Sequence, residues 1–292
     1  MKKTVIGIDI GGSTTKIVGF QFEQNKKPTL IEPQFVRATD PVTAMYGAFG
    51  RFTTENNIAL SDVDCIMTTG VGSSFMQQPI YGLKSQTVPE FSSIGRGGLY
   101  LSGLAEAIVV SMGTGTAIVH AKASVSEDGA PLVGGEYDTE IEYLGGTGVG
   151  GGTMLGLTKL LTGVGTIEHI DHLCKNGNLA NIDLRVGDIS KKSFREMSDN
   201  LTASNFGKVS DLATHSDLAL GVANLVAETI AMMAIFAARS FGIHDIVLIG
   251  NLSSITPVRE VFRALGPSFD VNFIIPENSQ FGTVIGAALH RA

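Results

Sequence analysis

Residues 145–152 of this 292-residue chain contain six glycines in eight positions, Gly-Gly-Thr-Gly-Val-Gly-Gly-Gly. Each glycine costs roughly 0.5–1 kcal/mol of backbone entropy relative to alanine, so a cluster of this kind needs a reason. Glycine permits positive φ and lets bare N–H groups approach an anion. An apolar helical pattern follows at once, from Thr153 to Leu161. A glycine loop that opens into a helix N-terminus is typical of a phosphate site, and a flexible linker is the alternative.

Two further segments each combine an apolar strand, a turn of glycines and hydroxyl residues, and a second apolar strand. The first, residues 4–20, has a strand that ends at Asp9, and its turn is made of Gly11, Gly12, Ser13 and Thr14. The second, residues 107–119, carries the polar and glycine positions Ser111, Gly113, Thr114, Gly115 and Thr116. One such turn is common in ordinary hairpins. Two of matching design, about a hundred residues apart, indicate an internal duplication.

The hairpins do not fit other common nucleotide signatures. The chain has no Gly-x-x-x-x-Gly-Lys-Ser/Thr sequence, which excludes a P-loop enzyme. A dinucleotide-binding glycine motif opens a helix, whereas residues 15–20 continue as strand. Asp9 at a strand end beside a hydroxyl-rich turn suits Mg²⁺, which takes hard oxygen ligands and keeps several waters. A turn-capping role is the alternative for Asp9.

Composition bounds the class of protein. Charged residues make up 17% and apolar residues 43% of the chain, which favours a globular fold with a buried core. The net charge is −7 and no basic stripe is present, so nucleic-acid binding is disfavoured. The two cysteines, Cys65 and Cys174, lie far apart, which argues against disulfide, zinc or iron–sulfur sites within one chain. We expect a cytoplasmic protein, because Lys2-Lys3 leads directly into a strand and the apolar stretch 218–241 contains Asn, Glu and Arg.

The candidate site residues must be positioned by strands and helices. Beyond the two hairpins, we expect strands at 33–38, 64–70, 245–252 and, at a sheet edge, 271–276. We expect helices at 43–54, 94–102, 153–163, 168–176, 218–241, 256–265 and 282–290. Alternating strands and helices around two hairpins indicate an α/β protein of two domains with a cleft between them. We place the domains at residues 1–104 and 105–292.

The motifs resemble a known superfamily. Gly7-Ile8-Asp9-Ile10-Gly11-Gly12-Ser13, Ser111–Thr116 and Leu248-Ile249-Gly250-Asn251 are similar to the two phosphate motifs and the adenosine motif of the actin–hexokinase–chaperone ATPases. That resemblance implies two ribonuclease-H-like (actin-like ATPase) domains with the active site in the interdomain cleft. More narrowly, the chain resembles type II pantothenate kinases over nearly its whole length. The motifs that carry this are 88–91 (Val-Pro-Glu-Phe), 145–153, 201–207 (Leu-Thr-Ala-Ser-Asn-Phe-Gly) and 282–287.

The resemblance implies an activity and a role for each motif residue. The family phosphorylates pantothenate with MgATP, the first step towards coenzyme A, and acts as a homodimer. Asp9 is expected to position Mg²⁺, through water, at the γ-phosphate, and Glu90 to act as the general base. The expected nucleotide contacts are Gly11, Gly12, Ser13, Thr14, Lys16, Ser111, Gly113, Thr114, Gly115, Thr116, Gly150, Gly151, Gly152, Gly250 and Asn251. For Glu90 the alternative is a surface carboxylate, and for Lys16 a solvated strand lysine.

The chain departs from the family pattern at the substrate end of the expected cleft. The family pattern has an arginine two residues before the Gly-Gly pair, where this chain has Tyr143. Tyrosine has no charged bidentate fork, so the substrate contacts near Tyr143 and Gly145 are in question. Arg96, six residues after Glu90, is one candidate for the missing charge, and a structural arginine is the other.

Several functions stay open at this point. The first is a pantothenate kinase, whose acceptor is pantothenate or a related pantothenamide or pantetheine, with acyl-coenzyme A as a further candidate ligand. The second is a kinase for another small alcohol or sugar, although the cysteine cluster of zinc-bearing sugar kinases is absent. The third is a reductase-activating ATPase, but no suitably placed cysteine follows a glycine turn. The fourth is a catalytically weak regulator that binds a nucleotide or coenzyme A. All four are compatible with a protein that contacts neither membrane nor nucleic acid.

Overall fold

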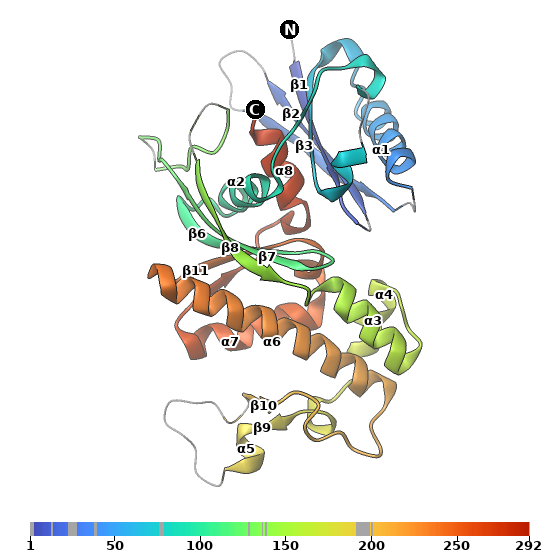
Figure 1. Cartoon of the computed structure of the whole chain (residues 1–292), viewed down its shortest axis with the longest axis vertical. Coiled ribbons are helices and arrows are strands. Elements are labelled where there is room, and N and C mark those ends of the chain that lie inside the picture. The colour runs from blue at the N-terminus through green and yellow to red at the C-terminus, as the bar shows by residue number, and fades with distance from the viewer. Residues whose placement is uncertain are drawn as a thin grey trace.

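The chain builds two five-stranded sheets with helices on both sides and between them (Figure 1). The computed structural model describes residues 3–12, 14–22, 28–37, 40–75, 79–127, 129–135, 137, 139–190, 199 and 201–291. The strands of the first sheet are β1 (Lys3–Ile10), β2 (Thr15–Phe22), β3 (Thr29–Val36), β4 (Val63–Thr69) and β5 (Ser85–Thr87). Those of the second are β6 (Glu106–Met112), β7 (Thr116–Ala123), β8 (Thr139–Thr147), β11 (Asp245–Ile249) and β12 (Asn272–Ile274).

The two sheets have the same topology. The first has the order β3-β2-β1-β4-β5, in which β1 pairs antiparallel with β2 and parallel with β4. The second has the order β8-β7-β6-β11-β12, in which β6 pairs antiparallel with β7 and parallel with β11. The internal repeat expected from the two hairpins is therefore present at the level of the fold. The α/β class is confirmed.

The helices form three layers around the sheets. They are α1 (Pro41–Glu55), α2 (Glu90–Ser102), α3 (Gly151–Thr162), α4 (Ile167–Cys174), α5 (Val186–Ile189), α6 (His215–Phe241), α7 (Thr256–Phe269) and α8 (Gly282–Leu289). One core joins α1 to the outer face of the first sheet through Ile6, Ile8 and Phe52. A second core lies between the sheets around α2 and α8, and a third joins the second sheet to α3, α4, α6 and α7.

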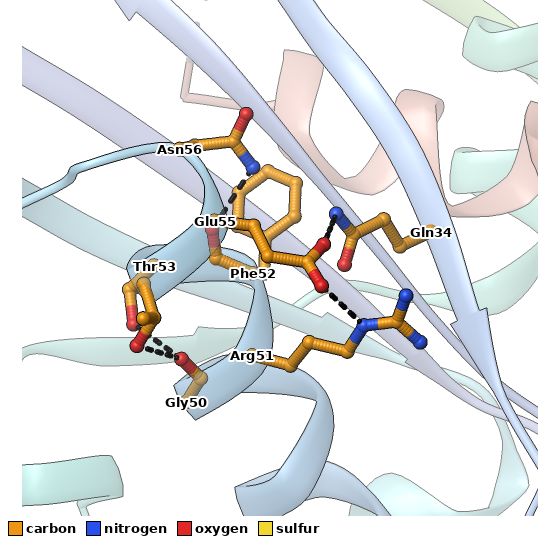
Figure 2. Close-up of polar contacts among 8 residues, drawn as sticks. Gln34, Gly50, Arg51, Phe52, Thr53, Glu55 and Asn56 are labelled. Carbon is orange, nitrogen blue, oxygen red and sulfur yellow. Dashed lines mark hydrogen bonds and ion pairs between the residues drawn. The ribbon is translucent and has the colours of Figure 1, made fainter.

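The end of α1 is held to β3 by polar contacts (Figure 2). Arg51 Nε donates to Glu55 Oε1 at 2.8 Å, and Gln34 Nε2 donates to Glu55 Oε2 at 2.8 Å. At the other end of the helix, Asp40 caps the first turn by accepting from the Thr43 N–H at 2.6 Å. These contacts fix α1 on the side of the first sheet that faces away from the second sheet.

The helices α2 and α8 cross between the two sheets at very short range. A methyl group on Gly97 of α2 would overlap the carbonyl of Gly282, and one on Gly286 of α8 would overlap the carbonyl of Ser93. Helix α2 comes from the first half of the chain but also packs on β6, β7 and β8, whereas α8 packs on β1, β2 and β4. The strands of the two sheets fall on either side of the expected boundary at 104/105, and α8 returns to the first sheet. The division into two domains at that point stays a prediction.

Helix α6 lies along the second sheet (Figure 1) and is largely apolar, with Asn224, Glu228 and Arg239 as interruptions. By length and composition alone it could cross a membrane, since its most apolar 18-residue stretch has a mean hydropathy of 1.9. However, 61% of its most apolar stretch is buried inside the protein, so it serves as a core helix. A small ribbon of β9 (Leu184–Arg185) and β10 (Thr202–Ser204), next to α5, covers one end of α6.

Several elements differ from the sequence expectations, among them the short elements β5, α5, β9 and β10, none of which was expected. Strand β3 begins at Thr29 rather than 33, and α2 begins at Glu90 rather than 94, directly after Pro89 and without a side-chain cap. Strand β8, at 139–147, was not expected at all. It includes Gly145 and Gly146, so the first part of the glycine run is sheet edge and not loop.

Candidate active site

A cleft of about 620 Å³ opens between the two sheets at the ends of their central strands. Open α/β sheets bind ligands at the carboxyl ends of their strands, at the point where the strand order reverses. The expected site residues that line the cleft are Asp9, Gly11, Gly12, Thr14, Lys16, Glu90, Ser111, Gly113, Thr114, Gly115, Thr116, Tyr143, Gly250 and Asn251. Ser13 lies outside the described residues.

The two hairpin turns face each other across this cleft. The first is closed by the Gly11 N–H, which donates to the Thr14 carbonyl at 3.0 Å, and the second by the Gly113 N–H, which donates to the Gly115 carbonyl at 2.9 Å. A methyl group on Gly12 would lie 3.8 Å from the Thr114 hydroxyl oxygen. The fold therefore brings together two turns that are a hundred residues apart in the chain.

Asp9 and Lys16 form the charged floor of the first turn. They lie opposite each other in the register of β1 and β2. Burial raises the pKa of Asp9 and lowers the pKa of Lys16, and the attraction between the two opposes both shifts. Lys16 Nζ also donates to the Gln280 carbonyl at 2.6 Å. A buried ammonium beside a carboxylate at the base of a turn is suited to bind a phosphate group locally in a protein of net negative charge.

Gly70 makes room for the carboxylate of Asp9. It follows β4, the parallel neighbour of β1, and has a φ of +85°. A methyl group there would lie 2.5 Å from Asp9 Oδ1 and 2.6 Å from the Ile10 carbonyl oxygen. Gly70 lines the cleft but was not among the expected site residues. The signal that could have revealed it is the Thr-Gly that ends an apolar strand, since parallel strands end at the same sheet edge.

Glu90 is the first residue of α2, directly after Pro89, and its side chain is exposed to the cleft. Partial withdrawal from water raises its pKa, and the negative charge of Asp9 raises it further. A helix N-terminus stabilises a carboxylate and so acts in the opposite direction. A carboxyl group with a raised pKa that faces a second carboxylate across a cleft is typical of acid–base chemistry.

The second part of the glycine run packs against a turn instead of offering N–H groups to a ligand. The N–H groups of Gly151 and Gly152, at the start of α3, donate to the carbonyls of Gly113 and Thr114 at 2.9 Å each. A methyl group on Gly150 would lie 2.7 Å from the Thr114 carbonyl oxygen. These glycines thus permit close packing of α3 on the second turn. Neither Gly145 nor Gly150 is among the residues that line the cleft.

Tyr143 lines the cleft and stacks on the residue that follows Glu90. Phe91 stacks on Tyr143, with ring centroids 4.0 Å apart and an interplanar angle of 10°. Arg96 does not line the cleft. It is buried, and its guanidinium donates to the carbonyls of Val133 at 2.8 Å and Tyr137 at 3.2 Å. The structure therefore gives Arg96 the structural role that was the alternative, and does not bring it to the substrate end.

A second pocket, of about 380 Å³, continues from the cleft on the Lys16 side. It shares Thr14, Lys16, Gly113, Thr114 and Asn251 with the cleft, and its further lining includes Gly151, Gly152, Leu155, Ser254 and Gln280. Gly250, with a φ of +93°, closes against β6, where a methyl group would lie 2.6 Å from the Met112 carbonyl oxygen. The two hollows together form one elongated site, with Lys16 near its middle and Glu90 in the cleft.

Sequence comparison decides the family. Residues 107–263 match the model of the family described as Fumble. The type II pantothenate kinase of Bacillus cereus (strain G9842) is 30% identical over 300 residues, which cover 99% of this chain and 99% of that protein. This chain belongs to the type II pantothenate kinase family.

Solved structures of other proteins share the fold of this pantothenate kinase family member. Component A of the Acidaminococcus fermentans (R)-2-hydroxyglutaryl-CoA dehydratase matches with a TM-score of 0.61 at 15% identity, over 99% of this chain and 97% of that chain. A ROK family glucokinase from Streptomyces griseus matches with a TM-score of 0.55 at 14% identity, over 98% of both chains. The expected actin-like ATPase fold is confirmed.

The motif 201–207, which supported the narrow resemblance, lies away from the cleft in this family member. Thr202 Oγ1 and Asn205 Nδ2 donate to the two oxygens of Glu228 on α6, at 2.7 and 2.8 Å. The buried carboxylate of Asp183 accepts from the Phe206 N–H and from Asn224 Nδ2, both at 2.8 Å. This network fixes the β9–β10 ribbon to α6.

Proposed function

We propose that this protein phosphorylates pantothenate with ATP to give 4′-phosphopantothenate, the first step of coenzyme A biosynthesis. The observation that carries the proposal is the pair of carboxylates, Asp9 and Glu90, that line the cleft. The charge of Asp9 contributes to the raised pKa of Glu90, and the chain belongs to this kinase family. Phosphoryl transfer requires mostly positioning and electrostatic stabilisation, with one carboxylate near the attacking hydroxyl.

Glu90 acts as the general base in this proposal. The 4′-hydroxyl oxygen of the acceptor forms the new bond to the γ-phosphorus, and the hydroxyl proton passes to the Glu90 carboxylate. The bond between the γ-phosphorus and the bridging oxygen breaks, and ADP leaves with its electron pair. A raised pKa makes the carboxylate a stronger base, which is the direction that assists proton removal near neutral pH.

The nucleotide lies along the elongated site, with its phosphates between the two turns. Lys16 is the cation that neutralises phosphate charge at this point, and the hydroxyls of Thr14 and Thr114 add donors. The adenosine end occupies the second pocket beside Asn251, which lines both hollows, and Gly250 of the cleft precedes it in the chain. This orientation leaves the Glu90 end of the cleft for the acceptor.

Asp9 is the proposed residue for Mg²⁺. No group of three or more His, Cys, Asp or Glu side chains suited to a metal occurs among the residues that the structure describes. A single carboxylate in a cleft between hydroxyl-bearing turns nevertheless fits this ion, which is bound in kinases by one or two carboxylates, waters and the phosphates themselves. When bound, Mg²⁺ supplies positive charge to the β- and γ-phosphates.

The remaining expectations are part of the same proposal. Pantetheine and pantothenamides carry the same hydroxyl group as pantothenate and are further acceptors, and acyl-coenzyme A is a candidate regulator. We propose a cytoplasmic homodimer that binds neither membrane nor nucleic acid. The exposed side chain of Phe236 on α6, next to the half-buried Met232 and Met233, offers an apolar contact for a second copy. A monomer in light scattering at micromolar concentration would contradict the dimer.

A coupled ADP-release assay tests the function. ADP release that depends on pantothenate is the expected result, and release with a sugar instead would replace pantothenate as the acceptor. Glu90→Gln should lower kcat by about 10²–10⁴-fold, with affinity for an ATP analogue retained. Glu140→Gln removes an equal charge at an exposed position outside the cleft and serves as the matched control. Normal turnover of Glu90→Gln would show that the base is elsewhere.

A further inference from the structure

Two buried serines behind the nucleotide site bond to each other. Ser253 and Ser279 are 1% and 8% exposed, and their hydroxyl oxygens lie 2.7 Å apart. The Ser253 hydroxyl donates to the Gly250 carbonyl, also at 2.7 Å. Its single proton is thereby used, so the Ser279 hydroxyl is the donor within the pair. Neither serine is among the residues that line the cleft or the second pocket.

The two serines hold the glycine that precedes Asn251. The Gly250 N–H donates to the Ser279 carbonyl at 3.0 Å, and the Gly250 carbonyl accepts from the Ser253 hydroxyl. Gly250 has a φ of +93°, a conformation that these two bonds fix on both sides. Asn251, the next residue, lines both hollows. The loop at Asn251 therefore takes its position from two side chains that do not themselves reach the site.

The residue after Ser279 holds the phosphate side of the site. The Gln280 carbonyl accepts from Lys16 Nζ at 2.6 Å. The segment around Gln280 is fixed by its own turn, in which the Phe281 N–H donates to the Asn278 carbonyl at 2.8 Å. Two consecutive residues thus hold the lysine at the phosphate end and the loop at the adenosine end at a set spacing.

We propose that Ser253 and Ser279 are positioning residues for the nucleotide. Their hydroxyl pair holds the loop at Asn251 at the distance from Lys16 that ATP spans. This inference rests on the proposed function, in which the phosphates lie at Lys16 and the adenosine beside Asn251. A loop that already has its bound position before the ligand arrives binds more tightly, because less ordering is needed on association. The pair therefore acts on nucleotide affinity and not on the transfer step in the cleft.

Alanine variants and binding of MgADP test the proposal. Ser253→Ala removes the donor to Gly250 and leaves the Ser279 hydroxyl without its partner, so the Kd for MgADP should rise by about tenfold. Ser279→Ala leaves the bond to Gly250 in place and should raise the Kd by about threefold. Because Ser279 acts through Ser253, the double variant should bind about as well as Ser253→Ala, whereas independent effects would multiply to about thirtyfold.

Steady-state kinetics separate this role from a general loss of structure. In all three variants kcat at saturating ATP should stay within about twofold of the parent protein, while KM for ATP rises with the Kd. Ser102→Ala is the matched control. The Ser102 hydroxyl also donates to a backbone carbonyl, that of Gly98 at 2.8 Å, but it lies at the C-terminal end of α2 and lines neither hollow. The control should change neither Kd nor kcat.

The possible results are distinct. A Kd within about twofold of the parent for both single variants overturns the inference, as does a kcat that falls in parallel with affinity or a double variant that multiplies the single losses. If Ser253→Ala does not fold, Ser279→Ala alone decides through its Kd and kcat. A parent protein that binds MgADP but does not phosphorylate pantothenate overturns the proposed function, and the Kd values then decide this inference by themselves. Absence of MgADP binding by the parent overturns both.

Discussion

Replacing Gly70 by alanine should damage both stability and catalysis, and the structure sets the size of each effect. A non-glycine residue at its φ of +85° costs about 1–2 kcal/mol. The new methyl group would lie 2.6 Å from the Ile10 carbonyl oxygen, and forced overpacking of this kind adds about 1–3 kcal/mol. The free energy of unfolding should therefore fall by about 2–5 kcal/mol, which a domain of ordinary stability survives.

The effect on catalysis follows from the contact with Asp9. The methyl group would lie 2.5 Å from Asp9 Oδ1, whereas ordinary contacts begin near 3.4 Å, so the carboxylate must move by about 3.4 − 2.5 = 0.9 Å. A displacement of about 1 Å at a reacting group can cost about 100-fold in rate. We expect a loss of that order in kcat for Gly70→Ala, measured by ADP release on protein whose fold has been checked by circular dichroism.

Gly82→Ala is the matched control. Gly82 also has a positive φ, +72°, but a methyl group there meets nothing within 4 Å, and the residue does not line the cleft. Urea unfolding should show a loss of about 1–2 kcal/mol for this variant, with kcat unchanged. The reasoning is refuted if Gly70→Ala, folded, keeps kcat within about threefold of the parent protein. In that case Asp9 does not need its observed position.

Three further perturbations have definite outcomes. The pKa of Glu90 is raised above the ordinary carboxyl value of 4.5, and the base must be ionised to accept a proton. The value of kcat/KM should therefore fall as the pH drops through that raised pKa, at a higher pH than an ordinary carboxyl group would give. Arg37, after β3, forms a 2.6 Å ion pair with Glu168 of α4 at the rim of the second pocket. Because the pair is exposed, Arg37→Glu should weaken binding of an ATP analogue by no more than about fivefold, and adding Glu168→Arg should restore it. Burial raises the pKa of Cys174 to about 12, so its thiol should resist alkylation at pH about 8 until the protein is unfolded.

Each of these outcomes has a clear opposite. An acidic limb at the ordinary carboxyl value would remove Glu90 as the titrating base. Failure of the double exchange at 37 and 168 to restore binding would show that the ion pair does not join the two sides of the pocket. Rapid alkylation of Cys174 in the native protein would mean that α4 separates readily from α6.

Much of the fold could be predicted because its central strands are unambiguous. The runs around Asp9 and Ser111 are apolar on both faces, as expected for strands covered on both sides, and each ends in glycine and hydroxyl residues. The similarity of the two hairpins predicted the internal repeat. Two repeated units related in this way bring their glycine–hydroxyl turns to the same cleft. The pairing of Asp9 with Lys16 also follows from a hairpin of this register.

Other parts depend on contacts that the sequence does not display. A glycine in such a run can bind an anion through its N–H group or can allow another backbone segment to pack closely against it. In the run at 150–152 it is the second turn that packs against the glycines. Strand β8 was missed because its end, Gly145–Thr147, is composed like a loop. The first turn of α2 was missed because Pro89 precedes it in place of a Ser, Thr, Asp or Asn cap, and no side chain caps the helix. Gly95, Gly97 and Gly98 lie in the part that was expected, where packing on α8 and the second sheet compensates for their low helix propensity.

The exchange of helices between the halves has a consequence for biosynthesis of the protein. The inner face of the first sheet is covered by α8, which comes from the last residues of the chain, Gly282–Leu289. As translation proceeds from the N-terminus, the strands of that sheet emerge long before the helix that covers them. Contacts of such high sequence separation form slowly, and an uncovered apolar face invites aggregation in the meantime. We therefore expect the inner face of the first sheet to stay uncovered until Gly282–Leu289 have left the ribosome.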